Sequence, residues 1–173
     1  MRINEIVIES EAVTPQRVSE TIKQVTAELI RDGYASNAYA VNDGMCETLA
    51  EDVVAMLGGE TATLFTVDAR NFCLNNDDAA GDCYWDATLL KRSWPQSRPP
   101  FGLTWRDIKY HVPSHVWIVF QQRHYDAEAP EGVDNFFELP LIRRGMEAIA
   151  KQKAARRVSR LAATPVPPVR SVG

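Results

Sequence analysis

The chain has 173 residues and a formal net charge of −4, with 45% apolar and 24% charged residues. This composition is ordinary for a globular protein with a substantial core, and nothing in it suggests a general nucleic-acid binder. No apolar run approaches the length of a membrane-spanning helix, and the N-terminal residues lack the apolar centre of a secretory signal. Three cysteines do not make a disulfide framework, so we expect a reducing, intracellular setting.

Two helices and one strand are predicted in the first 70 residues. Thr14 and Pro15 are typical of a helix start, and Gly33 is typical of its end. After a loop, the spacing of apolar residues predicts a second helix over about 43–57. A strand is predicted over 62–70.

An irregular stretch, a hairpin and a final helix follow. Residues 71–113 are rich in Asn, Asp, Pro and Trp, and we interpret them as an insertion with short helices near 86–92 and 104–110. A hairpin is predicted over 114–130 and a helix over about 141–160.

The order of these elements predicts the α+β class. We expect one domain over residues 1–160 and a Pro-rich C-terminal tail over 161–173, which has too few core-forming residues to fold alone. In this fold a helix carrying Cys46 packs on an antiparallel sheet, and further helices flank the pair.

Cys46 lies in "NDGMCETLA", in the first turn of the second predicted helix. The helix dipole and unpaired backbone N–H groups favour an anion there, so a thiolate would be stabilised. The alternative is that Cys46 is a small apolar packing residue beside the core. Cys73 and Cys83 lie in an acidic stretch, where nearby carboxylates raise a thiol pKa.

The hairpin "SHVWIVFQQRHYDAEAPEGV" places polar side chains on one face. If the chain reverses at Gln121 and Gln122, then Phe120 faces Arg123 and Trp117 faces Asp126. Because side chains alternate along a strand, one face then carries His115, Trp117, His124, Asp126 and Glu128. His115 and Asp126 become diagonal neighbours. A three-residue loop would instead put Asp126 on the opposite face.

A histidine held by an aspartate can take a proton from a thiol, while the carboxylate fixes the imidazole tautomer. Cys46, His115 and Asp126 are therefore candidates for a nucleophile, a base and its orienting group. An oxyanion hole needs a donor besides the Cys46 backbone N–H, and Asn42, Tyr39 and Asn37 are upstream candidates.

Three short motifs resemble the transglutaminase-like superfamily, which is related to papain-like cysteine enzymes. "GMCETLA" is similar to the segment around the nucleophile of that family, "HVW" to its His-x-Trp strand, and "HYDAEAP" to the following strand that carries the aspartate. The order Cys, His, Asp also agrees. The resemblance covers about residues 42–70 and 114–130.

The resemblance implies a papain-like core in which Cys46, His115 and Asp126 form a catalytic triad. Because Trp117 lies on the same face of the hairpin as His115, we expect it to pack against the His115–Asp126 pair and restrict water. It implies a peptidase, amidase, deamidase or transglutaminase, or a relative without activity, and it requires no cofactor. The whole chain also resembles small proteins of tailed bacteriophages. We therefore expect the host cytoplasm or the virion as its location.

Candidate metal sites fit the ligand spacing of zinc and calcium sites poorly. Zinc ligands from Cys73, Cys83, His111 and His115 do not have knuckle spacing. A calcium loop beginning at Asn76 has Ala87 where the bidentate glutamate belongs. The tryptophans at 85, 94 and 105 either form a substrate lid or, as we favour, pin the 71–113 stretch to a core.

The basic residues near the C-terminus have two interpretations. Arg156, Arg157 and Arg160 lie on the last predicted helix and Arg170 in the tail. They either form a solvated face or, with the tail, dock on a protein partner. The second interpretation favours an interaction or virion protein that keeps the fold without catalysis.

Overall fold

The computed structural model describes residues 12–59, 64–68, 87–108 and 115–162. The chain divides into two compact units. The first unit comprises Met1–Asp68 and Val116–Asp134, and the second comprises Ala69–His115 and Asn135–Gly173. Helices combine with a small antiparallel sheet, which confirms the α+β class. The predicted insertion and the last helix belong to the same unit.

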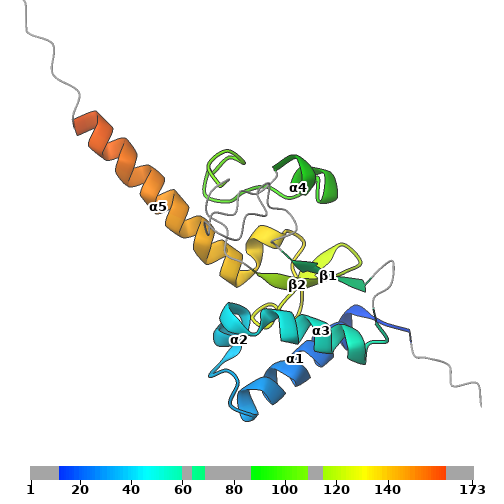
Figure 1. Cartoon of the computed structure of the whole chain (residues 1–173). Coiled ribbons are helices and arrows are strands. Elements are labelled where there is room, and N and C mark those ends of the chain that lie inside the picture. The colour runs from blue at the N-terminus through cyan, green and yellow to red at the C-terminus, as the bar shows by residue number, and fades with distance from the viewer. Residues whose placement is uncertain (1–11, 60–63, 69–86, 109–114, 163–173) are drawn as a thin grey trace, which may run out of the picture. The chain divides into compact units, whose positions relative to one another are not determined.

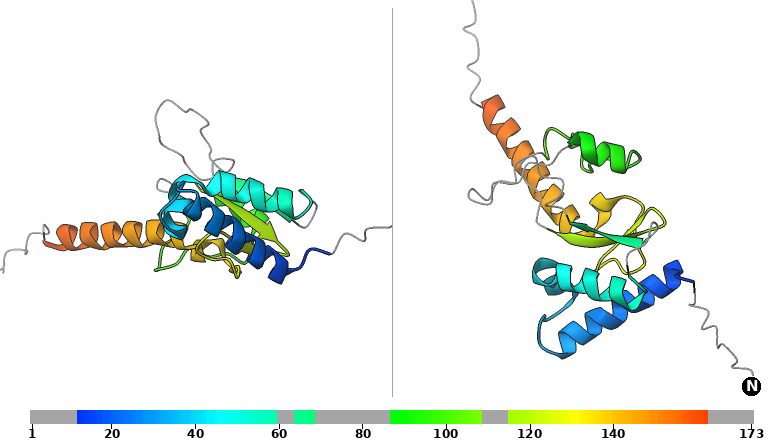
Figure 2. Two further views of the ribbon diagram at one scale, coloured as in Figure 1. Left: turned by 90° about the horizontal axis from the view of Figure 1, so that it is seen from below. Right: turned by 45° about the vertical axis from the view of Figure 1, so that its right-hand side comes forward.

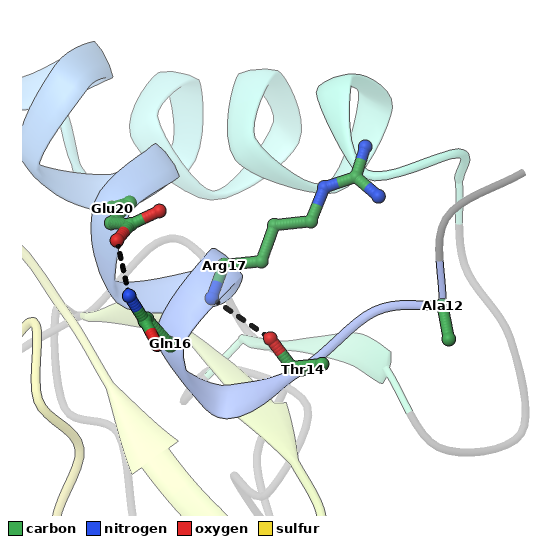
Figure 3. A pocket seen from close by; sticks show the side chains of 5 residues that line it. All are labelled: Ala12, Thr14, Gln16, Arg17 and Glu20. Carbon is green, nitrogen blue, oxygen red and sulfur yellow. Dashed lines mark hydrogen bonds between the residues drawn. The ribbon is translucent and has the colours of Figure 1, made fainter.

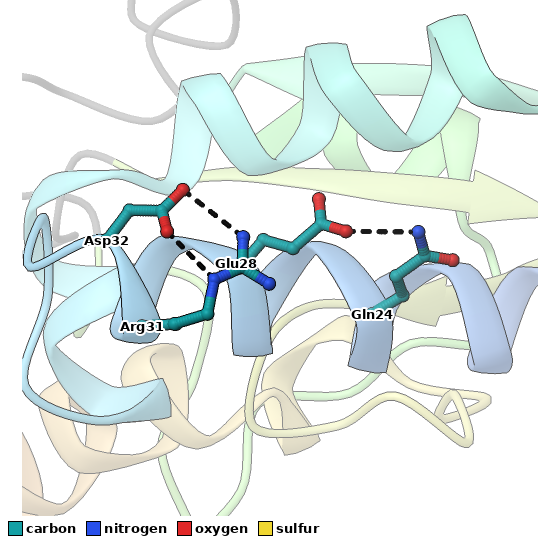
Figure 4. Close-up of polar contacts among 4 residues, drawn as sticks. All are labelled: Gln24, Glu28, Arg31 and Asp32. Carbon is teal, nitrogen blue, oxygen red and sulfur yellow. Dashed lines mark hydrogen bonds and ion pairs between the residues drawn. The ribbon is translucent and has the colours of Figure 1, made fainter.

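Helix α1 (Pro15–Arg31) starts and ends where the sequence indicates (Figure 1). The Thr14 hydroxyl accepts the Arg17 N–H at 3.2 Å, and Pro15 occupies the first turn, where its missing N–H costs nothing. Gly33, at φ 81°, follows the end of the helix. The outer face is polar, with contacts that include the Gln24–Glu28 hydrogen bond and the Arg31–Asp32 ion pair (Figure 4).

The predicted loop before the second helix is wrong in part, because it contains helix α2 (Ala38–Gly44). The Asn37 side chain accepts the Ala40 N–H at 3.0 Å and so caps α2. Met45 then separates α2 from α3 (Cys46–Met56). The helix predicted over about 43–57 is therefore interrupted at Met45: residues 43 and 44 end α2, and α3 forms most of the rest.

The sheet has the order β1-β2-β3 and is antiparallel throughout, with strands β1 (Leu64–Asp68), β2 (Val116–Phe120) and β3 (Arg123–Tyr125). The described part of the predicted 62–70 strand is thus extended. α3 packs on β1 and β2, and α1 runs beside α3 on the same side of the sheet (Figures 1 and 2).

The reversal between β2 and β3 falls on Gln121 and Gln122, which was the condition for the predicted register. Their φ values are 48° and 65°, the left-handed pair that a two-residue type I′ turn requires. Phe120 accordingly pairs with Arg123, and Ile118 with Tyr125. The predicted register is therefore confirmed.

One face of β2 packs against the helices, and the other does not belong to that core. The core of the first unit joins β2 residues Val116, Ile118 and Phe120 to the buried ridges of the helices. Its helical members are Val18, Ile22, Val25, Leu29, Val41, Leu49, Ala50, Val53 and Val54, and Leu57, which follows α3, joins them. Alternation directs Trp117 and Val119, both buried, to the opposite face of β2.

The second unit contains α4 (Ala87–Ser93), the 3₁₀ helix η2 (Phe136–Glu138) and α5 (Pro140–Ala162). Trp94 packs on Phe136 and Trp105 on Phe137, each with ring centroids 5.3 Å apart. These contacts confirm that Trp94 and Trp105 attach the irregular stretch to a core, while Trp85 lies outside the described residues.

The helix predicted over 104–110 is wrong for its described part, because residues 104–108 form turns. The Asp107 carboxylate accepts both the backbone N–H and the hydroxyl of Thr104 at 2.7 Å. It also binds the Lys153 ammonium group from α5 at 2.8 Å. An aspartate that bonds back to its own turn in this way competes with helix formation.

Helix α5 changes character along its length. Its first half buries Leu141, Ile142, Met146 and Ile149, whereas every residue from 151 to 160 is exposed. Within the described ranges of the chain, no helix has the length and apolar character needed to cross a membrane.

Candidate functional site

Cys46 is the first residue of α3, as the nucleophile hypothesis requires. No side chain caps this helix start; Met45 is the N-cap and its carbonyl accepts the Leu49 N–H at 2.9 Å. Cys46 carries a thiol of intermediate burial that packs against the edge of the first unit's core. Its location therefore agrees both with a stabilised thiolate and with a packing role.

Asp126 directly follows β3 and is buried, with 1% of its surface exposed. Its Oδ1 accepts the backbone N–H groups of Glu128 at 3.0 Å and Ala129 at 2.8 Å. The carboxylate thus closes a tight turn after the strand, which fixes its orientation.

Asn42 links α2 to this turn. Its Oδ1 accepts the Ala127 N–H at 3.1 Å, and its Nδ2 donates to Glu128 Oε2 at 3.0 Å. Asn42 is completely buried, so both ends of its amide serve these contacts. The structure gives Asn42 a positioning role: it holds the segment after Asp126 to the chain four residues before Cys46.

His124 and Trp117 form a buried pair on the face of the hairpin opposite the helices. The Trp117 indole N–H donates to His124 Nδ1 at 3.1 Å, so the proton of the neutral ring lies on Nε2. Burial lowers the pKa of His124 to about 4, although the charge of Asp134 opposes the shift. His124 is therefore neutral near pH 7 and accepts from Trp117. The predicted register put both residues on this face but did not indicate the bond.

The backbone on the far side of His124 is also fixed. His124 and Val133 exchange two backbone hydrogen bonds of 2.8 Å, and the Arg123 guanidinium donates to the Gly132 carbonyl at 2.7 Å. The Gly132 Cα lies against the Tyr125 ring, where a Cβ would come within 2.4 Å of Tyr125 Cε1. The return of the chain after β3 is thereby held tightly to the hairpin.

His115 is buried and immediately precedes β2. It belongs to the second unit, while Cys46 and Asp126 belong to the first, so the assembly of the three stays a prediction. The other candidates of the sequence differ in exposure: Tyr39 on α2 is 45% exposed and Trp117 only 1%. Asn37 is the N-cap of α2.

A surface hollow of about 480 Å³ lies at the start of α1, and none of the predicted site residues lines it (Figure 3). Ala12, Thr14, Gln16, Arg17 and Glu20 line it. Gln16 donates to Glu20 at 2.8 Å, so these two polar groups satisfy each other. We assign the hollow no role.

Among the described residues, no three His, Cys, Asp or Glu side chains gather closely enough to hold a metal ion. Of the zinc ligands weighed from the sequence, Cys73, Cys83 and His111 lie outside the described residues. Arg170 of the tail lies outside them as well.

Comparisons with protein-family models, with curated proteins and with solved structures found no match to this chain.

Proposed function

We propose that the protein is a thiol-dependent acyl-transfer enzyme that acts on amide bonds, with Cys46 as nucleophile, His115 as base and Asp126 as the group that orients the base. The observation that supports this most directly is the Asn42 bridge. It holds the turn after Asp126 next to the chain segment that leads into Cys46. The likeness of three short motifs to transglutaminase-like enzymes agrees with this assignment, including a papain-like core.

In the proposed reaction His115 removes the proton from the Cys46 thiol, and the thiolate attacks the carbonyl carbon of the amide. The backbone N–H of Cys46, at the start of α3, would donate to the oxyanion. His115 then protonates the leaving amine, and water or a second amine resolves the thioester. Because Asn42 is buried and engaged, the exposed Tyr39 hydroxyl is the better candidate for a second donor.

The proposal places one demand on the backbone. Cys46 packs against the core that includes Val116 and Ile118, whereas strict alternation assigns His115 to the Trp117 face. His115 precedes the first residue of β2 and is not bound by the alternation of the strand. Asp126 likewise follows the last residue of β3. Both side chains must depart from that alternation for His115 to contact the thiol and Asp126 together.

Alkylation of the three cysteines tests the proposal. At pH 6.5 an ordinary thiol is about 1% thiolate, so an activated Cys46 should react with iodoacetamide at least about tenfold faster than Cys73 or Cys83. Peptide mass spectrometry gives the three rates separately. His115→Ala should remove the advantage of Cys46, and His124→Gln, a change of the other hairpin histidine, should leave it in place. Equal, slow labelling of all three thiols would contradict an enzyme.

A second candidate function is an interaction protein of the virion or of a phage-infected host that keeps this fold without turnover. The exposed basic half of α5 supports it, because residues 151–160 are ten successive exposed residues of a helix, as a docking surface requires. The same labelling distinguishes the candidates, since an interaction protein needs no reactive thiol.

A further inference from the structure

Four basic residues of α5 form a continuous stripe, which we call the basic stripe: Lys153, Arg156, Arg157 and Arg160. Their spacing of i, i+3, i+4 and i+7 places them within about 100° of the helix circumference and about 10 Å of its length. All four are exposed. The fifth basic residue of this half, Lys151, projects from the opposite side.

The basic stripe continues the apolar stripe of the same helix. Ile142, Met146 and Ile149 face the core of the second unit, and a further step of four residues leads to Lys153. The helix face that is packed in the first half is therefore charged and exposed in the second half. In Figures 1 and 2 that half of α5 extends beyond η2 and α4, the other helices of its unit.

The first member of the basic stripe already binds a carboxylate. Lys153 Nζ lies 2.8 Å from Asp107 Oδ2, and this contact, with the bonds from Thr104, lowers the pKa of Asp107 to about 2. The next two turns offer arginines, whose guanidinium groups bind carboxylates through two parallel hydrogen bonds. The sequence has no acidic residue between 148 and 162.

We propose that the basic stripe is a docking site for an acidic helical segment of a partner protein, with Glu or Asp at matching i, i+3, i+4, i+7 positions. The charge of the rest of the chain favours a short acidic peptide over nucleic acid. The whole chain has a formal charge of −4, so the chain without these four cations has a charge of −8. This negative charge repels the parts of a long polyanion that extend beyond the basic stripe. A stripe about 10 Å long matches the few charges of two helical turns.

Fluorescence anisotropy with the full-length protein at 50 mM salt tests the proposal. The probe is a fluorescein-labelled alanine-based helical peptide with four glutamates at the matching positions, and its glutamine analogue is the matched probe. We expect saturable binding of the glutamate peptide, at least about tenfold weaker binding of the glutamine analogue, and further weakening with salt.

Two variants that change the charge of the protein equally distinguish binding by the basic stripe from attraction by the net charge. Arg157→Glu should weaken peptide binding by about fivefold or more, whereas Lys151→Glu, on the other side of the helix, should change it less than about twofold. Circular dichroism checks that α5 is intact in both. Equal weakening by both variants would overturn the proposal, as would the absence of binding. Tighter binding of a 20-base-pair DNA duplex than of the peptide would overturn it in favour of nucleic acid.

Discussion

His124 shows how burial sets the chemistry of one residue. The ring is fully buried and accepts from the Trp117 N–H, which only its unprotonated Nδ1 can do. Its pKa is about 4 in the folded protein and about 6.5 in the unfolded chain, so the unfolded state binds the proton more tightly. The stability from neutral His124 is complete above pH 6.5 and is lost as the pH falls to 4.

We therefore expect the free energy of unfolding to decrease by about 3 kcal/mol between pH 7 and pH 4 on account of His124 alone. Urea unfolding at intervals of one pH unit measures the slope. His124→Gln should flatten the curve in this window. Asp107 does not interfere with this measurement, because its lowered pKa changes the free energy of unfolding only below about pH 4. If the free energy of unfolding of His124→Gln fell as steeply as that of the wild type between pH 6.5 and pH 4, this assignment would be contradicted.

Asn42 makes a second residue-scale prediction. Asn42→Ala removes the acceptor of the buried Ala127 N–H and the donor to Glu128, so we expect a loss of about 2 kcal/mol in the free energy of unfolding. Asn37→Ala, which removes the exposed cap of α2 and an exposed hydrogen bond to Ser36, should cost about 1 kcal/mol. Denaturant unfolding of both variants gives the comparison, and an equal or smaller loss for Asn42→Ala would argue against a positioning role.

His124 and Asn42 also show which side-chain contacts the sequence can indicate and which it cannot. The period-two pattern of the hairpin places Trp117 and His124 on one face, so their proximity follows from the register. Asn42 makes hydrogen bonds to Ala127 and Glu128, which lie 85 and 86 positions further along the chain. No local sequence pattern indicates contacts at that separation. The hydrogen bonding of Asn42 to the turn after Asp126 becomes evident only in the three-dimensional structure.

At the scale of elements, the return of the chain after β3 depends on Gly132. Its φ of 75° is strained for other residues, and a Cβ would meet the fully buried ring of Tyr125. We expect Gly132→Ala to lower the free energy of unfolding by about 3 kcal/mol, the sum of backbone strain and overpacking. Gly58→Ala, at φ 100° with nothing within 4 Å, should show the strain alone, about 1 kcal/mol. Equal losses in chemical unfolding would contradict the clash.

The elements were predictable where local chemistry and periodicity agree. α1 has a cap, a first-turn proline and a regular apolar stripe, and it forms as expected. α2 was missed because it has only seven residues, too few for an apolar stripe, although Asn37 is a residue type that often caps helices. The turn at Gln121 and Gln122 was placed correctly without the Asn-Gly pair typical of type I′ turns, because the flanking strands fix it.

At the scale of the whole molecule, the candidate chemistry divides between the two units. The nucleophile helix and the aspartate turn share the first unit, and the base candidate His115 belongs to the second. The sequence pattern could bring His115 and Asp126 together only through the hairpin register. That register is confirmed for the pairs between 118–120 and 123–125, and His115 and Asp126 lie just outside the two strands. The pairing of His115 with Cys46 requires tertiary arrangement that periodicity does not encode.

The pH dependence of Cys46 alkylation tests this pairing most directly. If His115 takes the proton of the Cys46 thiol, the rate should already be high at pH 6 and change little up to pH 8, because the thiolate is held as an ion pair with the imidazolium. In His115→Ala the rate should instead rise steadily towards a midpoint near pH 8.5, the ordinary value for a thiol. Superimposable profiles for the two proteins, both rising near pH 8.5, would contradict the proposed enzyme.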